Sequence, residues 1–357
     1  MKTLKIDSYI KSQLSEFIDF TTNLALGKHP TLSPPFTKYQ EDNNDILSFY
    51  NSFFADYLKN LKSIDNQILD KVNMIMQHLI EKNNREKIEF NIIKETESIC
   101  HTILDATTDY FKGLPACAYE TFEKTMIENN CHLLKLLPQI LSKDFHFYRV
   151  RKGQDFKDRK ELFHTPFQLR VKCDSYRFST LGYPSLYLAS TLETALLESN
   201  VKDLKEYSCS CFKSTRELRF IDLALPNREL AFWEQYSLAI FYPLIMACNL
   251  KVKQKDEPFK PEYIIPQLLV QTVRLHSDFI DGISYISTKH KKICYTDFNQ
   301  RNFIMYIPYA EAEKGYSKVL AEKLVSTKPM SCYVEKATTV KEIEEKCNKL
   351  NFDKIIF

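Results

Sequence analysis

The sequence predicts an α+β protein in which an all-α helical bundle over residues 1–143 precedes a mixed-sheet domain over residues 144–357. The chain has 357 residues, a length typical of two domains. In its first part apolar residues recur at intervals of three and four, the period of amphipathic helices. Near residue 145 the pattern changes to short apolar or alternating segments separated by helical stretches, which indicates mixed α and β structure.

The helical pattern is clearest over residues 46–57 and 68–79, and the stretch 27–44 between helices, with three prolines among polar residues, predicts a long loop. We place the domain boundary near residue 143. Beyond it, the segments with strand character are 145–151, 185–189, 218–225, 282–287 and 302–308. The segments with helical character are 191–200, 228–249 and 264–277.

Composition is typical of a folded protein, with 44% hydrophobic and 13% aromatic residues. The net charge of +3, from 49 basic and 46 acidic residues, is too balanced to indicate a nucleic-acid or membrane-surface protein. The N-terminus lacks an apolar signal core, and no segment has the roughly 18 uninterrupted apolar residues of a membrane span. We therefore expect a cytoplasmic protein with no membrane partner and no specific nucleic-acid partner.

The ten cysteines include no two pairs at the spacing of a structural zinc site. Cys209 and Cys211 would share one face of a strand, as small buried apolar residues do. No metal is predicted, and free thiols are expected. There is also no dinucleotide-binding G-x-G-x-x-G and no P-loop, which disfavours a hydride-transferring enzyme. Gly182 and Gly282 are interpreted as turns that lead into strands.

Polar residues are dense between 147 and 198, which reads FYRVR, then ELFHTPFQLR, then YRFSTLGYPSLYLASTLETALLES. Together with DGISYIS at 281–287, these segments occur in the order of the RES family, and over about residues 145–310 the chain resembles that family. The family's polar positions fall on Arg149, Arg177, Tyr187 and Glu198, and its late serine on Ser287.

The sequence departs from the family at one motif. Many members read G-R-W-N before the glycine, whereas this chain has Tyr176, Arg177, Phe178 and Ser179. An aromatic residue still follows the arginine, but Ser179 becomes a second candidate for the family serine.

The resemblance implies an ADP-ribosyltransferase-like fold that consumes NAD⁺, and the chemistry suits the residue types. Cleavage of the bond between nicotinamide and ribose develops an oxocarbenium-like cation, which a carboxylate such as Glu198 would stabilise. Arg149 and Arg177 would clamp the pyrophosphate through their guanidinium forks. Tyr187 would stack on the nicotinamide, and Ser287 would supply a hydroxyl to the ribose or to the attacking phosphate or water.

Each of these residues also has a structural interpretation. A strand arginine is commonly a solvated charge, Tyr187 would be a core aromatic, and Ser287 an ordinary strand residue. Glu193 is a competing carboxylate on the same predicted helix as Glu198. His164 is assigned equally to a structural hydrogen bond and to substrate contact.

The helical part is similar to the N-terminal domains of the HEPN type that are sometimes fused to RES domains. Catalytic HEPN ribonucleases need an arginine followed four to six residues later by a histidine. This part contains one arginine, Arg85, with no histidine within that reach. A non-catalytic role in regulation, dimerisation or sensing is therefore expected.

Our leading hypothesis is an intracellular NAD⁺-degrading enzyme, a glycohydrolase or phosphorylase that releases nicotinamide and acts as a toxin or bacterial defence effector. One alternative is an ADP-ribosyltransferase that modifies a macromolecule, and another is a non-catalytic NAD-binding interaction module. An antitoxin or immunity protein, as in a toxin–antitoxin pair, and a homo-oligomer are left open as partners.

Overall fold

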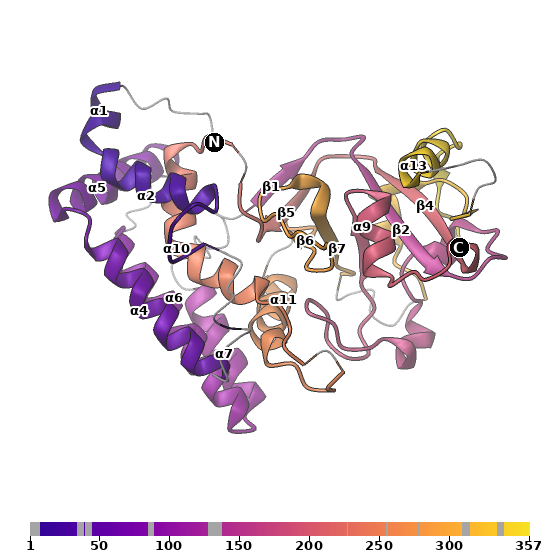
Figure 1. Ribbon diagram of the computed structural model, residues 1–357, viewed down its shortest axis with the longest axis horizontal. Coiled ribbons are helices and arrows are strands. Elements are labelled where there is room, and N and C mark those ends of the chain that lie inside the picture. The colour runs from indigo at the N-terminus through magenta and orange to yellow at the C-terminus, as the bar shows by residue number, and fades with distance from the viewer. Residues whose placement is uncertain are drawn as a thin grey trace. The chain divides into compact units, whose positions relative to one another are not determined.

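The computed structural model describes residues 8–33, 39, 45–84, 89–127, 138–226, 228–254, 256–276, 279–308, 315–333 and 339–357. The predicted loop over 27–44 lies largely outside these residues, since only 27–33 and Tyr39 belong to them. Two compact units are present: residues 1–137 with 225–269, and residues 138–224 with 270–357 (Figure 1). None of the helices within the described ranges combines the length and apolar character that a membrane crossing needs.

The first unit is helical. Its N-terminal helices bury the apolar residues that the three- and four-residue spacing singled out; Ile46, Tyr50, Phe53, Phe54 and Tyr57 are all buried. The predicted bundle is thus confirmed. Its described helices are α1 (Ser8–Gln13), α2 (Ser15–Ala25), α4 (Ile46–Lys62), α5 (Asn66–Asn84), α6 (Ile92–Phe111), α7 (Pro115–Ile127), α10 (Phe232–Asn249) and the start of α11 (Ile264–His276).

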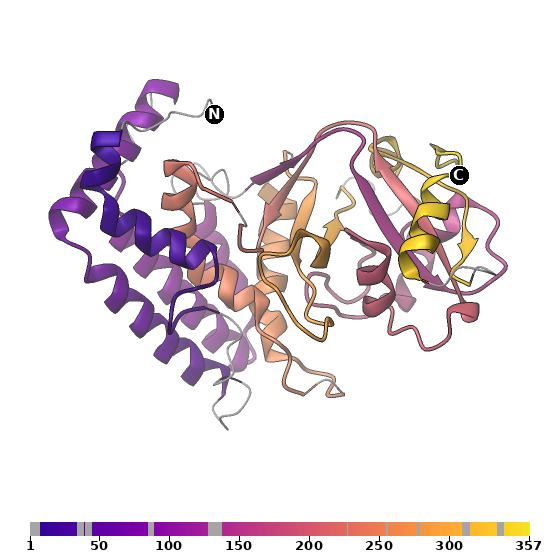
Figure 2. The same cartoon turned by 45° about the horizontal axis from the view of Figure 1, so that its top comes forward.

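Helix α10 belongs to this helical unit although it comes much later in the chain. It is apolar on every side and almost wholly buried, and it contacts α2, α4, α5 and α6. Figures 1 and 2 show it in salmon among the indigo and purple N-terminal helices. Residues 225–269 lie within the predicted C-terminal domain of 144–357 but group with the helical unit. The all-round apolar character of α10 explains this packing with the bundle.

One contact explains how α10 tolerates a proline in its interior. Pro243 has no N–H, so the carbonyl of Ala239, four residues earlier, lacks its helical donor. The Tyr57 hydroxyl of α4 donates to this oxygen at 2.5 Å. Burial raises the pKa of Tyr57 well above its ordinary value, so the phenol keeps the proton that it donates.

The second unit contains, within the described residues, a ten-stranded sheet in the order β1-β5-β6-β7-β3-β2-β4-β8-β10, with β9 on β4. Among the described strands, β5 and β6 form the only parallel pair. The predicted α+β class is confirmed. The strands are β1 (Pro138–Leu141), β2 (His146–Lys152), β3 (Leu186–Ala189), β4 (Tyr207–Ser214), β5 (Leu218–Asp222), β6 (Gly282–Ile286), β7 (Arg301–Met305), β8 (Leu324–Ser326), β9 (Met330–Ser331) and β10 (Asp353–Lys354), and the other helices are α9 (Leu192–Glu198), α12 (Lys318–Glu322) and α13 (Val340–Asn348).

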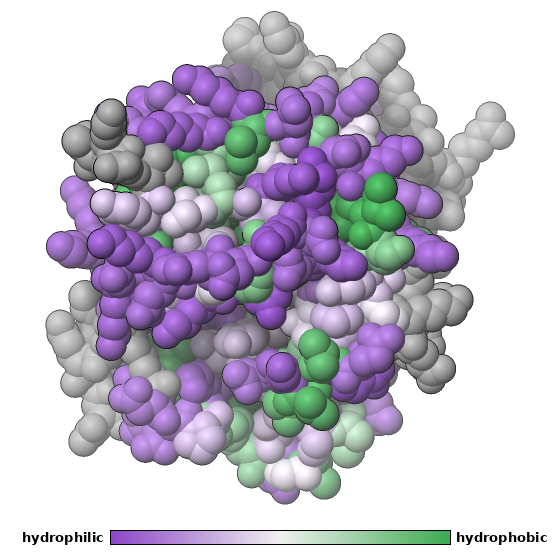
Figure 3. Space-filling view, turned by 90° about the vertical axis from the view of Figure 1, so that its right-hand side faces the viewer, coloured by the Kyte–Doolittle hydropathy of each residue, from purple (hydrophilic) through white to green (hydrophobic). Residues whose placement is uncertain are grey.

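Each face of the central sheet carries its own core, because neighbouring residues in a strand point to opposite faces. Phe147 joins Leu186, Leu188 and Phe303 in one cluster. Tyr148 joins Ala189 in the other, where α9 and α13 pack and where Cys209 and Cys211 share a face. The outer surface seen in Figure 3 is mostly hydrophilic, with apolar side chains in small separate patches.

The two glycines interpreted as turns differ in the structure. Gly182 has a φ of 74°, a conformation that favours glycine, so the expected turn is present. Gly282 does not have a positive φ, so the prediction that it is needed for a turn is wrong. A Cβ at Gly282 would lie 1.8 Å from the carbonyl oxygen of Ile304, so this glycine allows β6 and β7 to approach closely.

Candidate functional site

Glu198 is the last residue of the short helix α9. Thr191 caps the start of the helix by accepting from the Thr194 N–H, and Ala195 packs against the sheet. Glu198 follows Ala195 by three residues and therefore turns toward the sheet as well. The competing carboxylate, Glu193, is exposed. The geometry thus separates the two glutamates of this helix.

Two buried side chains converge on Glu198. The Ser287 hydroxyl donates to Oε1 at 2.5 Å, and the Asn302 amide Nδ2 donates to the same oxygen at 2.7 Å. Ser287 is 0% exposed and Asn302 is 3% exposed. The backbone N–H of Ser287 donates to the Gln300 carbonyl at 2.7 Å, which fixes the serine at the end of β6.

This arrangement has a chemical consequence. An ionised carboxylate accepts hydrogen bonds and donates none, which matches the two donors that Ser287 and Asn302 present. Both side-chain donors bind Oε1, so within the described residues Oε2 accepts no side-chain hydrogen bond. Glu198 is therefore held in place through one of its two carboxylate oxygens.

Asn302 was not singled out from the sequence. It begins the apolar segment NFIMYIP, and its register explains its role: Asn302 lies opposite Ala189 of β3 and Tyr285 of β6. A buried amide in a strand flanked on both sides needs a polar partner, and Glu198 supplies it. An amide at the start of an otherwise apolar central strand was the available signal.

Tyr187 lies on the same sheet face as Asn302. Tyr187 lies two positions before Ala189, the partner of Asn302, so the side chains of Tyr187 and Asn302 are about 7 Å apart along the strand direction. The Tyr187 hydroxyl donates to Ser179 Oγ at 2.7 Å. The two candidate serines therefore have different partners: Ser179 accepts a hydrogen bond from Tyr187, and Ser287 donates one to Glu198.

Arg149 lies on β2 at the point where this strand separates from β3, which we call the β2–β3 split. Strands β2 and β3 are paired through one residue pair, Tyr148 with Ala189, and the Arg149 guanidinium then donates from Nη1 to the Tyr187 carbonyl at 2.7 Å. Its Nε is buried and has no hydrogen-bond partner in the described part of the chain. Burial, reinforced by the charge of Arg151, lowers the pKa of Arg149 to about 10, so it remains charged near neutral pH.

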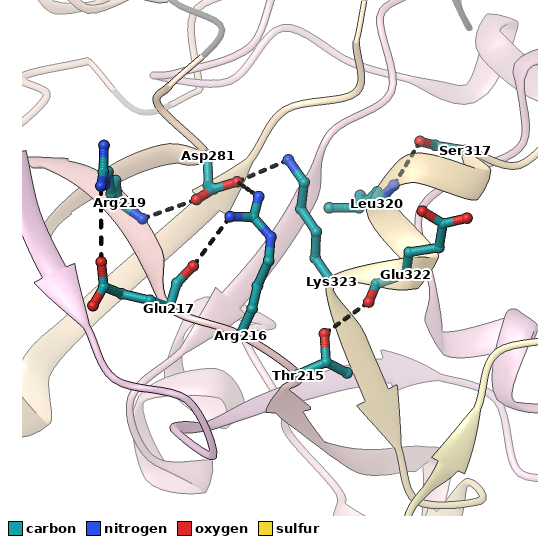
Figure 4. A network of polar contacts seen from close by, with 9 residues as sticks. All are labelled: Thr215, Arg216, Glu217, Arg219, Asp281, Ser317, Leu320, Glu322 and Lys323. Atoms are coloured by element: carbon teal, nitrogen blue, oxygen red, sulfur yellow. Dashed lines mark hydrogen bonds and ion pairs between the residues drawn. The ribbon is translucent and has the colours of Figure 1, made fainter.

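Asp281 shows how a buried charge looks when it is fully paired (Figure 4). Its carboxylate accepts from Arg216 Nη2 at 2.9 Å, from Lys323 Nζ at 2.8 Å and from the backbone N–H of Arg219 at 2.9 Å. These partners join the start of β5 to the turn before β8. Arg149, by contrast, has no carboxylate partner among the described residues, and an unpaired buried guanidinium is a typical anion-binding group.

Arg177 is buried at 8% exposure in the loop before β3. Burial raises the pKa of Tyr295, and the positive charge of Arg177 acts in the opposite direction, which indicates that the two side chains are near each other. The next residue, Phe178, packs on Tyr285 with 4.6 Å between ring centroids. The predicted clamp of Arg149 and Arg177 on a pyrophosphate stays a prediction.

His164 has a structural role. Its Nε2 accepts from the backbone N–H of Ser317 at 2.8 Å, which leaves Nδ1 to donate to the Thr165 carbonyl at 2.8 Å. Both ring nitrogens are therefore used by backbone groups. Of the two roles weighed for this residue, the structure supports the structural hydrogen bond.

Comparison with known proteins identifies the segment that carries this site. Residues 146–308 match the RES domain family, from the first residue of β2 to just beyond β7. This part of the chain is a RES domain. The match contains Arg149, Tyr187, Glu198, Ser287 and Asn302.

A relative extends the similarity beyond the RES domain. A Bacillus subtilis (strain 168) protein named "Putative toxin YopC" is 26% identical over 315 residues, which make up 81% of this chain and 66% of the relative. The chain thus aligns with slightly less than two thirds of the relative's length. No solved structure matches the chain.

Proposed function

We propose that the chain is an NAD⁺-degrading enzyme with toxin activity, which breaks the bond between nicotinamide and ribose at Glu198. The observation that supports this most directly is the convergence of Ser287 and Asn302 on one oxygen of Glu198. An oriented carboxylate stabilises the oxocarbenium-like cation that forms as nicotinamide leaves. The toxin role is supported by the RES domain and by the name of the Bacillus subtilis relative.

Other residues fit the rest of the substrate. The Arg149 guanidinium, with its unpartnered Nε, suits a phosphate oxygen of the pyrophosphate. The Tyr187 ring lies beside Tyr176 at 5.7 Å between centroids and offers an aromatic surface for the flat nicotinamide. Tyr187 of β3 thus supplies both the aromatic ring and the backbone carbonyl that accepts from Arg149.

The test is to incubate purified full-length protein with NAD⁺ and to identify the products by mass spectrometry. Free nicotinamide with ADP-ribose or its phosphate is expected. A label from NAD⁺ that ends on protein or nucleic acid would instead indicate a transferase, and NAD⁺ binding without turnover would indicate a non-catalytic module. Induced expression in a bacterial host should lower cellular NAD⁺ and arrest growth, and Glu198→Gln should relieve both effects.

A further inference from the structure

The helix α13 (Val340–Asn348) lies beyond residue 308, where the RES match ends, but it contacts the helix that carries Glu198. Figure 1 shows α13 in yellow, late in the chain. A capping box stabilises its first turn: Thr339 accepts from the Glu342 N–H, and the Glu342 carboxylate accepts from the Thr339 N–H. α13 is therefore a well-formed helix outside the RES match, and its contacts with α9 decide whether it contributes to the site.

Apolar side chains on one face of α13 attach it to the sheet. Ile343 and Cys347 are one helical turn apart, both are buried, and they pack in the cluster that contains Leu192 of α9. At the end of the helix, the Asn348 amide donates from Nδ2 to the hydroxyl of Tyr148 in β2 at 2.8 Å. α13 thus has a fixed place on the sheet without the help of any polar contact with α9.

Glu344, the residue after Ile343, makes the polar contact with α9. Its Oε2 accepts from the backbone N–H of Leu192 at 2.7 Å, although 152 residues separate the two in the sequence. The first N–H groups of a helix have no acceptor within the helix, and in α9 the Thr191 side chain accepts from the Thr194 N–H. Glu344 therefore supplies from another helix the acceptor for the first N–H of α9.

A second attachment holds the same end of α9 from within the RES match. The Thr194 hydroxyl donates to the Asn299 carbonyl at 2.7 Å, and the Ser190 hydroxyl donates to the same oxygen at 2.8 Å. One attachment leaves a short helix able to pivot, whereas two attachments to different elements fix its direction. Glu344 and Asn299 together therefore fix the direction of α9.

The direction of α9 matters because Glu198 is at its other end. The helix has 7 residues, so Leu192 and Glu198 are about 9 Å apart along its axis. A tilt of about 6° over this length moves the carboxylate by about 1 Å. A displacement of about 1 Å at a reacting group costs up to about 10²-fold in rate, but Ser287 and Asn302 also restrain Glu198 and resist part of it.

We propose that α13 positions the helix that carries the catalytic carboxylate and that Glu344 is the positioning residue, an inference that rests on the proposed function. Glu344 fixes the start of α9 and thereby fixes Glu198 relative to the ribose of bound NAD⁺. It acts through a backbone N–H at the opposite end of the helix and takes no part in the chemistry. A part of the chain outside the RES match thus completes the site.

Three substitutions in the full-length protein separate the geometry of Glu344 from its charge. Glu344→Gln keeps an acceptor oxygen at the same reach but removes the charge. Glu344→Asp keeps the charge but shortens the side chain by one methylene, and Glu344→Leu removes both. We expect Glu344→Gln to keep kcat for NAD⁺ cleavage within about threefold and the other two to lose about tenfold. KM should stay within about twofold, because the groups expected to bind NAD⁺ are unaltered.

The matched control is Glu345→Leu, since Glu345 is the exposed neighbour of Glu344 on the same helix and its variant should keep normal kcat. Hydrogen exchange of the peptide that covers α9, followed by mass spectrometry, gives a readout that does not need NAD⁺. Exchange should be faster in Glu344→Asp and Glu344→Leu than in Glu344→Gln and the control. Thermal unfolding checks that each variant is folded, and Glu344→Asp decides the test where Glu344→Leu does not fold.

The outcomes separate this inference from the proposed function. Unaltered kcat in folded Glu344→Asp, a larger loss in Glu344→Gln than in Glu344→Asp, or a loss of kcat without faster exchange of α9 would each overturn the positioning role while NAD⁺ cleavage itself stands. If the unaltered protein does not cleave NAD⁺, the proposed function fails and the positioning role fails with it, even where the exchange of α9 follows the expected pattern.

Discussion

Buried polar side chains are satisfied differently in the two units. In the helical unit they mostly bond to their own helix: Thr21, Thr96 and Thr107 each donate to the carbonyl four residues earlier. In the sheet unit they bond across segments that are far apart in the sequence, as Ser287 and Asn302 do with Glu198 over 89 and 104 residues. A hydrogen bond from a side chain to its own helix needs only that helix to form. Side chains that are distant in the sequence and meet in one cluster are, in contrast, brought together without any need of the fold itself.

The largest effect is expected from dividing the chain at residue 143. A fragment of residues 144–357 keeps Glu198 and its partners but strips α10 of the helices α2, α4, α5 and α6 that cover it. We expect this fragment to be insoluble alone and NAD⁺ cleavage to return only when it is co-expressed with residues 1–143. Activity found in the N-terminal fragment alone would contradict the location of the site.

Replacing Glu198 with Gln should leave the fold intact, since the two side chains are nearly isosteric. The charge that faces the developing cation is lost, so kcat for NAD⁺ cleavage should fall by about 10² or more. Glu193→Gln, in the same helix but exposed, is the control and should keep normal turnover. A folded Glu198→Gln protein with unaltered turnover would remove this residue from the mechanism.

Asn302 is a positioning residue in this proposal, because it acts through Glu198. Asn302→Leu keeps the size of the side chain but removes the donor to Oε1, and loss of a hydrogen bond to a charged group should lower kcat about 10-fold to 100-fold. KM should change little, which a general loss of structure would not produce. A change confined to KM would speak against positioning.

Variants of Arg149 distinguish a role in NAD⁺ binding from a role in the stability of the fold. Arg149→Lys keeps the charge without the planar fork and should weaken NAD⁺ binding about tenfold. Arg149→Met removes a buried charge that has no carboxylate partner, so binding should be lost while the free energy of unfolding stays equal or rises by about 1 kcal/mol. Calorimetric unfolding and NAD⁺ titration of both variants measure the two quantities. A strongly destabilised methionine variant would assign Arg149 to structure.

The smallest effect concerns the helical unit. Tyr57→Phe leaves the Ala239 carbonyl in α10 without a donor, and this should lower the free energy of unfolding by about 1–2 kcal/mol. The rate of NAD⁺ cleavage by the folded protein should not change. A urea titration compared with the activity at low denaturant distinguishes the two effects.

The fold was predictable where one local period dominates. Segment 46–57 forms α4, and the alternating segments at 145–151 and 282–287 form β2 and β6. The location of α10 was not predictable in this way, because a helix that is apolar on every side does not specify which helices cover it.

The candidate site was predictable only in part. Residue types and order singled out Glu198 and Ser287, which the structure joins. Asn302 was missed because its role depends on strand register, which pairs it with Ala189 and Tyr285. The two arginines, expected to work together, have different surroundings: Arg149 lies at the β2–β3 split and Arg177 near Tyr295.

The three crossings of the chain between its units, at residues 137/138, 224/225 and 269/270, also set an order on synthesis. The N-terminal helices leave the ribosome first but lack α10, while strands β1 to β5 emerge before that helix and β6 and β7 after it. Neither unit can therefore be completed before the other has begun, although multidomain chains commonly fold one domain at a time from the N-terminus. The nascent protein exposes unfinished apolar surface from both units at once, and the groups that surround Glu198 assemble only when β7 has been made.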